Sequence, residues 1–137
     1  MMKKATIYLT MLLLGFVFIL SCAKDEVSEN DPIIGTWNLK EIIVGSQSVD
    51  VSNMACYGSS TLTFTETDMR LILKEPVSEG STQCESETMN FKWNKNGSNY
   101  VIVDDEASDY FGISVSPGEV QLTASYDGGS STFVFRK

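Results

Sequence analysis

The segment TMNFKWN at residues 88–94 alternates large apolar with polar side chains and leads directly into Asn96-Gly97. A period of two residues is typical of a β-strand that buries one of its faces. The Asn-Gly pair readily adopts the positive φ angles of a type I′ turn, which joins two antiparallel strands. This part of the chain is therefore predicted to form a β-hairpin on an antiparallel sheet.

Similar short alternating segments run from residue 34 to the end of the chain, separated by turn sequences such as Pro117-Gly118 and Asp127-Gly128-Gly129. They predict eight strands, at residues 35–44, 61–67, 69–74, 88–94, 99–103, 110–116, 120–126 and 131–137. The alternation is lost at residues 41–44, which predicts a β-bulge. Short turns favour sequential pairing, and closure of the sheet removes exposed edges. We expect an all-β, eight-stranded antiparallel up-and-down barrel.

The N-terminus carries Lys3 and Lys4, followed by an almost wholly apolar run at residues 7–20. This run is shorter than the roughly 20 residues that a membrane-spanning helix needs. A charged start followed by a short apolar run is typical of a cleaved secretory signal. A short transmembrane anchor that remains in the mature protein is the alternative.

The sequence ILSC at residues 19–22 resembles the lipobox of bacterial lipoproteins. The resemblance implies that residues 1–21 are a signal peptide and that Cys22 becomes the lipidated first residue of the mature chain. Several acyl chains on one residue would hold the protein firmly in a membrane. Residues 22–32 would then form a flexible tether, and residues 33–137 would form the barrel domain.

The residues after Cys22 bear on the destination of such a lipoprotein. Ala23 differs from the Asp that commonly retains lipoproteins in the inner membrane, which favours the outer membrane. The sequence AKDE at residues 23–26 resembles the tether of surface-exported lipoproteins in some Gram-negative anaerobes. It favours the cell surface over the periplasmic face, and the alternative is a plain solvated linker.

The chain is acidic, with 10 Lys and Arg against 18 Asp and Glu, a formal net charge of −8. Removal of residues 1–21 takes away two lysines and no acidic residue, so the mature chain has 8 − 18 = −10. Binding to nucleic acid depends on Lys and Arg that neutralise phosphates. This charge therefore argues against a nucleic-acid partner.

With Cys22 lipidated, Cys56 and Cys84 remain as an even pair in an exported chain, where a disulfide is the expected state. A closed loop of this length stabilises a fold by about 3.5 kcal/mol in the chain-entropy estimate. Both cysteines precede strands that start at the same end of the predicted sheet, one strand apart. The loops must lean toward each other to bring them within bonding distance. A reactive thiol or metal pair would lack a neighbouring His or a CxxC spacing.

The sequence IIGTWNL at residues 33–39 contains Gly35-Thr36-Trp37, which resembles the G-x-W signature of lipocalins. Together with the lipobox, the cysteine pair and the terminal FVFRK, residues 33–137 resemble the small lipocalin-like domains of Gram-negative lipoproteins. The resemblance implies that Trp37 closes one end of the barrel and that Arg136 packs across it. In the alternative interpretation Trp37 is an ordinary core residue and Arg136 is solvated.

An eight-stranded barrel can be filled by side chains or can hold one small molecule. We expect any pocket to be apolar and to open opposite the Trp37 end. Each candidate is more often simply a residue of the core. The candidate ligand-binding residues are Met89, Phe91, Trp93, Tyr100 and Ile113.

The chain contains no histidine, which excludes Ser-His and Cys-His catalysis and histidine-based zinc sites. The acidic sequence DDEASD at residues 104–109 lacks the order of a calcium loop and is interpreted as solvated. We therefore expect no enzyme, metal or cofactor. The predicted function is a membrane-anchored lipocalin-like module that binds a small apolar or amphipathic ligand. The alternative is a surface interaction protein with a filled barrel, whose loops 75–83 and 104–109 contact a protein or glycan.

Overall fold

The computed structural model describes residues 31–137, so the predicted leader, Cys22 and most of the predicted tether lie outside the described part. Nearly all of the regular structure is β-strand. The elements are β1 (Gly35–Val44), β2 (Gln47–Asp50), η2 (Tyr57–Ser59), β3 (Thr61–Phe64), β4 (Asp68–Pro76), β5 (Cys84–Asn96), β6 (Asn99–Ile102), α2 (Asp105–Ser108), β7 (Phe111–Ser116), β8 (Glu119–Tyr126) and β9 (Gly129–Arg136).

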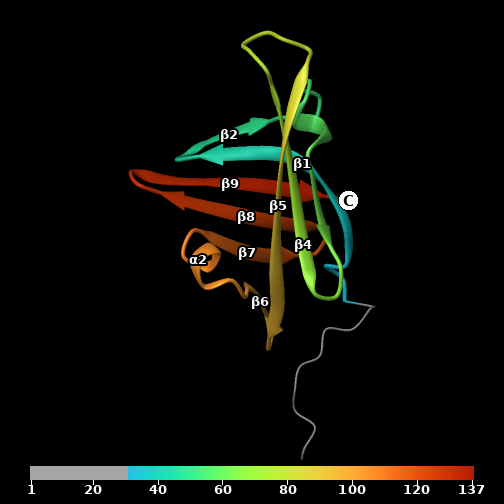
Figure 1. Ribbon diagram of the computed structural model, residues 1–137, viewed down its shortest axis with the longest axis vertical. Coiled ribbons are helices and arrows are strands. Elements are labelled where there is room, and N and C mark those ends of the chain that lie inside the picture. The colour runs from blue at the N-terminus through green and yellow to red at the C-terminus, as the bar shows by residue number, and fades with distance from the viewer. Residues whose placement is uncertain (1–30) are drawn as a thin grey trace, which may run out of the picture.

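The strands form one sheet in the order β6-β5-β4-β3-β1-β9-β8-β7, and all of its neighbours are antiparallel. Apart from β1 and β9, which join the two ends of the chain, and β1 and β3, which have β2 between them in the sequence, the neighbours are consecutive strands. The sheet curls into a nearly closed barrel (Figure 1). The predicted eight-stranded antiparallel up-and-down barrel is confirmed. The short strand β2 pairs with β1 as an additional hairpin, which the sequence analysis did not predict.

The barrel has two distinct ends. At one end, called the Trp37 end, β1 begins, β9 ends, and the turns β3–β4, β5–β6 and β7–β8 are found. The opposite end, called the disulfide end, carries the β4–β5 connection, α2 and the β8–β9 turn. Alternating strand directions in an up-and-down barrel produce this division.

Apolar side chains fill the barrel interior near the Trp37 end. Residues from β1, β3, β4, β8 and β9 are almost completely buried there, namely Leu39, Leu62, Phe64, Met69, Leu71, Leu122 and Phe135. Toward the disulfide end the inward side chains Leu73 and Met89 are only half-buried. The register shift in the β1–β9 pair falls between Leu39 and Glu41, slightly earlier than the bulge that the sequence predicts.

Two details of the loops differ from the sequence-based expectations. The β5–β6 pair runs to Asn96↔Asn99, so the two loop residues are Gly97 and Ser98, one position later than predicted. Gly97 has a φ of 63°, and a leading glycine is typical of a type II′ turn. Part of the acidic loop forms α2, because Asp104 Oδ1 accepts hydrogen bonds from the backbone N–H groups of Glu106 and Ala107, both at 3.0 Å. Within residues 31–137, no helix has the length and apolarity to cross a membrane.

The barrel is open along one line, which we call the seam, between β6 and β7. Within residues 31–137, β6 pairs only with β5 and β7 pairs only with β8. Aromatic contact partly bridges this opening, since the rings of Phe91 on β5 and Phe111 on β7 lie 5.4 Å apart. Both rings are half-buried.

The predicted disulfide between Cys56 and Cys84 is confirmed, with a Cα–Cα distance of 5.4 Å. Cys56 precedes η2 and Cys84 begins β5, so the bond joins two connections at the disulfide end. It spans β4, the strand that lies between β3 and β5, as the leaning loops require.

The loop that carries Cys56 depends on a close backbone approach at Gly58. A Cβ at this position would lie 2.5 Å from the backbone oxygen of Ser52. We expect Gly58→Ala to destabilise the fold by about 1 to 3 kcal/mol, because the backbone must shift to relieve the clash. Thermal unfolding followed by circular dichroism measures this as a lower Tm.

Gly112 on β7 provides the matched control, since a Cβ there would have no neighbour within 4 Å. Gly112→Ala should leave the Tm unchanged or raise it slightly, because it restricts the unfolded chain. Equal Tm values for the two variants would contradict the close approach at Gly58.

Candidate ligand-binding site

Residues 31–34, here called the N-terminal segment, cover the Trp37 end of the barrel. Ile33 is completely buried, and its carbonyl oxygen accepts a hydrogen bond of 2.8 Å from Trp37 Nε1. The backbone N–H of Ile34 donates to the carbonyl of Asp31 at 3.0 Å, which turns the segment across the end. Trp37 and the N-terminal segment thus close the core together.

Asp31 fixes this segment to the β5–β6 hairpin. One carboxylate oxygen forms an ion pair of 2.9 Å with Lys95 Nζ, and the other accepts hydrogen bonds from Tyr100 at 2.7 Å and Ile33 N at 3.1 Å. The Asp31 side chain is only 5% exposed. Burial raises the pKa of Asp31, but the hydrogen bonds from Ile33, Lys95 and Tyr100 outweigh it, so the pKa lies below its ordinary value.

A second lysine lies over the tryptophan ring. Lys137 Nζ is 4.6 Å from the centre of the Trp37 ring, a cation–π distance, and it donates to the carbonyls of Pro32 at 3.4 Å and Ile34 at 3.2 Å. The cation is therefore Lys137, and the prediction of Arg136 in this position is wrong.

Side chains alternate along β9, and Phe135 points into the core. Arg136 therefore points to the outer face, where its guanidinium forms ion pairs with Glu41 at 2.8 Å and Glu119 at 3.0 Å. These contacts raise the pKa of Arg136, chiefly through the hydrogen bond to Glu41. Lys137 follows the last residue of the strand and can turn back over the barrel end.

These elements surround a groove of about 590 Å³, here called the Trp37 groove. Its walls come from three regions that the fold brings together at the end of the seam: the N-terminal segment with β1, the β5–β6 hairpin, and the β7–β8 turn. The lining residues are Pro32, Trp37, Lys95, Ser98, Tyr100, Val115, Ser116, Pro117, Gly118 and Lys137. The volume is in the range of small-molecule sites, about 300 to 1,000 Å³.

The groove combines apolar walls with a polar rim. Tyr100 on β6 and Val115 on β7 belong to opposite sides of the seam, and Trp37 lies between the groove and the core. Among residues 31–137, the only charged side chains that line the groove are those of Lys95 and Lys137. Such a site suits a molecule with one apolar and one polar part.

The structure separates the five candidate ligand-binding residues. Tyr100 lines the Trp37 groove, and its ring lies 5.8 Å from that of Trp93. Trp93 itself is a core residue, because it is 3% exposed and its Nε1 donates to the Thr65 carbonyl at 2.9 Å. Met89, Phe91 and Ile113 are half-buried on the inner face of the barrel. The groove is at the Trp37 end, whereas we expected the opposite end.

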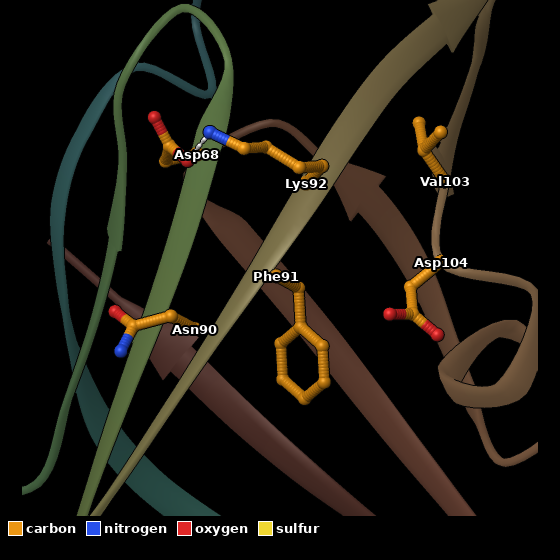
Figure 2. Close-up of a pocket in the computed structure, with 6 residues that line it drawn as sticks. All are labelled: Asp68, Asn90, Phe91, Lys92, Val103 and Asp104. Carbon is orange, nitrogen blue, oxygen red and sulfur yellow. Dashed lines mark hydrogen bonds and ion pairs between the residues drawn. The ribbon is translucent and has the colours of Figure 1, made fainter.

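A smaller pocket of about 260 Å³ lies on the seam side of β5 (Figure 2). Phe91 projects from β5 into the space between this strand and the segment that carries Val103 and Asp104. Lys92 points away from that space and forms an ion pair with Asp68 (Figure 2). The volume is below the range of typical small-molecule sites. We therefore take the Trp37 groove as the candidate site.

Sequence reasoning did not identify Lys95 and Lys137 as site residues. A signal for Lys95 was present, since it lies two residues after the inward-facing Trp93 and so shares its face of the strand. The same signal existed for Lys137, which lies two residues after the inward-facing Phe135, although its place over the Trp37 ring also depends on where β9 ends. Within residues 31–137, no cluster of three or more His, Cys, Asp or Glu could hold a metal ion.

Comparison of the chain with protein-family models, curated proteins and solved structures finds no match.

The Asp31 contacts should make stability depend on pH in the acid range. Asp31 has a lowered pKa when folded, so its contribution is complete above the unfolded value of about 3.9 and is lost as the pH falls below it. We expect Asp31→Asn to cost about 2 kcal/mol at pH 7. The difference from the wild type should shrink below pH 4, as measured by urea unfolding between pH 3 and pH 7. A constant difference across this range would contradict the role of the charged carboxylate.

Proposed function

We propose that the protein is a non-enzymatic binding module that holds a small amphipathic molecule in the Trp37 groove. One observation carries the proposal: a groove of ligand size lies beside an otherwise filled barrel end, lined by aromatic and aliphatic side chains. An apolar cavity with a few convergent polar groups is the usual form of a small-molecule site.

The fold supports this function because it holds the walls of the groove firmly. Trp37 is fixed by its hydrogen bond to Ile33, and Tyr100 by its hydrogen bond to Asp31. The groove therefore needs little ordering when a ligand binds, which lowers the entropic cost of binding. The resemblance to lipocalins agrees with a binding role, although the proposed site is at the other end of the barrel.

We further propose that a lipid on Cys22 anchors this module to the outer membrane, with the barrel on the cell surface. Only eight residues lie between Cys22 and Asp31, so nine residue steps span about 32 Å at full extension. Since the chain enters the barrel at the Trp37 end, the groove would be close to the membrane. An amphipathic ligand could then exchange with the lipid layer over a short distance.

A binding role for the groove predicts that a bulky side chain at its rim removes the ligand. Ser98 lines the groove from the β5–β6 turn, and Ser78 is an exposed residue of the β4–β5 connection at the other end. In native mass spectrometry of protein extracted from its host membrane, we expect wild type and Ser78→Trp to retain a small molecule. Ser98→Trp should have lost it. Retention by all three proteins would place the ligand elsewhere.

The anchor proposal has a separate test. We expect Cys22→Ala protein either to be found in the soluble fraction or to keep its leader uncleaved, because no acyl chains can be attached. Fractionation followed by intact-mass measurement detects both the location and the lost lipid mass. Cys22→Ala protein in the membrane fraction, with its leader removed, would contradict the anchor.

A surface interaction protein is the second candidate function. Apolar side chains are exposed on either side of the loop 104–109, with Val103 52% and Tyr110 55% accessible. They would suit contact with a protein or glycan. Extraction of the wild-type protein with no bound small molecule, together with a cross-linked partner at these residues, would favour this function over the first.

A further inference from the structure

We infer that the ligand of the Trp37 groove is an anionic amphiphile whose acidic group is bound by Lys137. This inference rests on the proposed binding function of the groove and specifies its ligand class. The chemistry is that of a single acidic group, such as a carboxylate, on a flexible apolar body. The two lysines that line the groove have different surroundings.

Lys95 is already neutralised by the protein. Its ammonium group forms the 2.9 Å ion pair with Asp31, which is itself held by Tyr100 and the Ile33 backbone. The hydrogen bond to Asp31 also raises the pKa of Lys95, which keeps this pair charged. An anionic ligand at Lys95 would have to displace a nearly buried carboxylate, at the cost of leaving that charge unpaired.

Lys137 has no such partner. Within residues 31–137 it forms no ion pair, and its hydrogen bonds go to two neutral backbone carbonyls at 3.2 and 3.4 Å. These bonds are longer than the usual 2.7 to 3.2 Å range or at its limit. Contact with the Trp37 ring fixes the ammonium group over the groove. A ligand oxygen there would gain a charge-assisted hydrogen bond.

The charges of the residues that line the groove also favour an anionic ligand. The chain has 18 acidic residues against 10 basic ones, yet within residues 31–137 none of the residues that line the groove is acidic. A cationic head group would meet Lys137 at close range and be repelled. An anionic one would pair with the Lys137 ammonium group, while its apolar part contacts Tyr100, Val115 and Pro117.

Photo-crosslinking to the full chain in phosphatidylcholine vesicles tests this inference. Three probes carry the same diazirine-labelled eight-carbon chain and differ in their head group, which is a carboxylate, an alcohol or a primary ammonium. Peptide mapping identifies labelled residues of the groove. We expect the carboxylate probe to label the groove at least tenfold more efficiently than the ammonium probe, with the alcohol between them.

Substitutions at Lys137 show whether this residue causes the preference for an anionic head group. Lys137→Met should lower labelling by the carboxylate probe about tenfold and leave labelling by the alcohol unchanged, whereas Lys137→Arg should retain the preference. Lys74→Met, on β4 and outside the groove, changes the net charge equally and should have no effect. The unchanged alcohol signal also reports that the groove of the Lys137→Met variant is intact.

The outcomes separate the two proposals. Equal labelling of the groove by all three probes, or an unchanged preference in Lys137→Met, would overturn the anionic ligand and leave the binding function in place. Failure of every probe to label the groove would overturn both. A hexadecanoic acid probe that is incorporated into the vesicles beforehand distinguishes a ligand drawn from the membrane from one taken from solution, and groove labelling from either source supports the inference.

Discussion

The pairing of β1 with β9 determines where the ends of the chain meet. These strands join residues nearly a hundred positions apart, from Asn38↔Arg136 to Val44↔Ser131. Because they are antiparallel, the start of β1 and the end of β9 lie at the same end of the barrel. Lys137 can then lie over Trp37, and the N-terminal segment can accept its hydrogen bonds. Without this pair Lys137 would not reach Trp37 and the N-terminal segment, and this side of the groove would be lost.

The unequal lengths of β5 and β6 explain why the barrel is open on its other side. β5 has 13 residues and β6 only four, because the chain leaves the sheet after Ile102 and Asp104 caps α2. The hairpin therefore offers β7 little edge with which to pair. At the Trp37 end, Tyr100 on β6 and Val115 on β7 both line the groove. Incomplete closure thus provides a lateral site without emptying the core.

Periodicity in the sequence was sufficient for the strands and for most of the core. Leu62, Phe64, Met69 and Leu71 point inward as their alternation requires, since each strand buries one face. β2 escaped prediction because all four of its residues are exposed and carry no alternating pattern. Gly97 has the positive φ that a hairpin turn needs, but a glycine can be either the first or the second residue of a two-residue loop. Only the pairing of β5 with β6 shows that it is the first.

The site was less predictable, because it is assembled from segments far apart in the sequence. Tyr100 was identified from its strand, whereas its contact with Asp31 depends on how the N-terminal segment crosses the barrel end. Alternation after Phe135 was enough to place Arg136 outside the core, but the resemblance to lipocalins favoured the opposite assignment. The same alternation puts Lys137 on the face of Phe135, but its contact with the Trp37 ring depends on where β9 ends.

The N-terminal segment has a mechanical consequence. Any tension applied through the N-terminus acts first on the contacts of residues 31–34, because β1 begins only at Gly35 and is held between β3 and β9. The force loads the Asp31 contacts and the two carbonyls that bind Lys137 first. It reaches the hydrogen bonds of the sheet only after these contacts. A pull would therefore deform one wall of the groove before it separates any strand, so that the force needed to open the site is much smaller than the force needed to unfold the barrel.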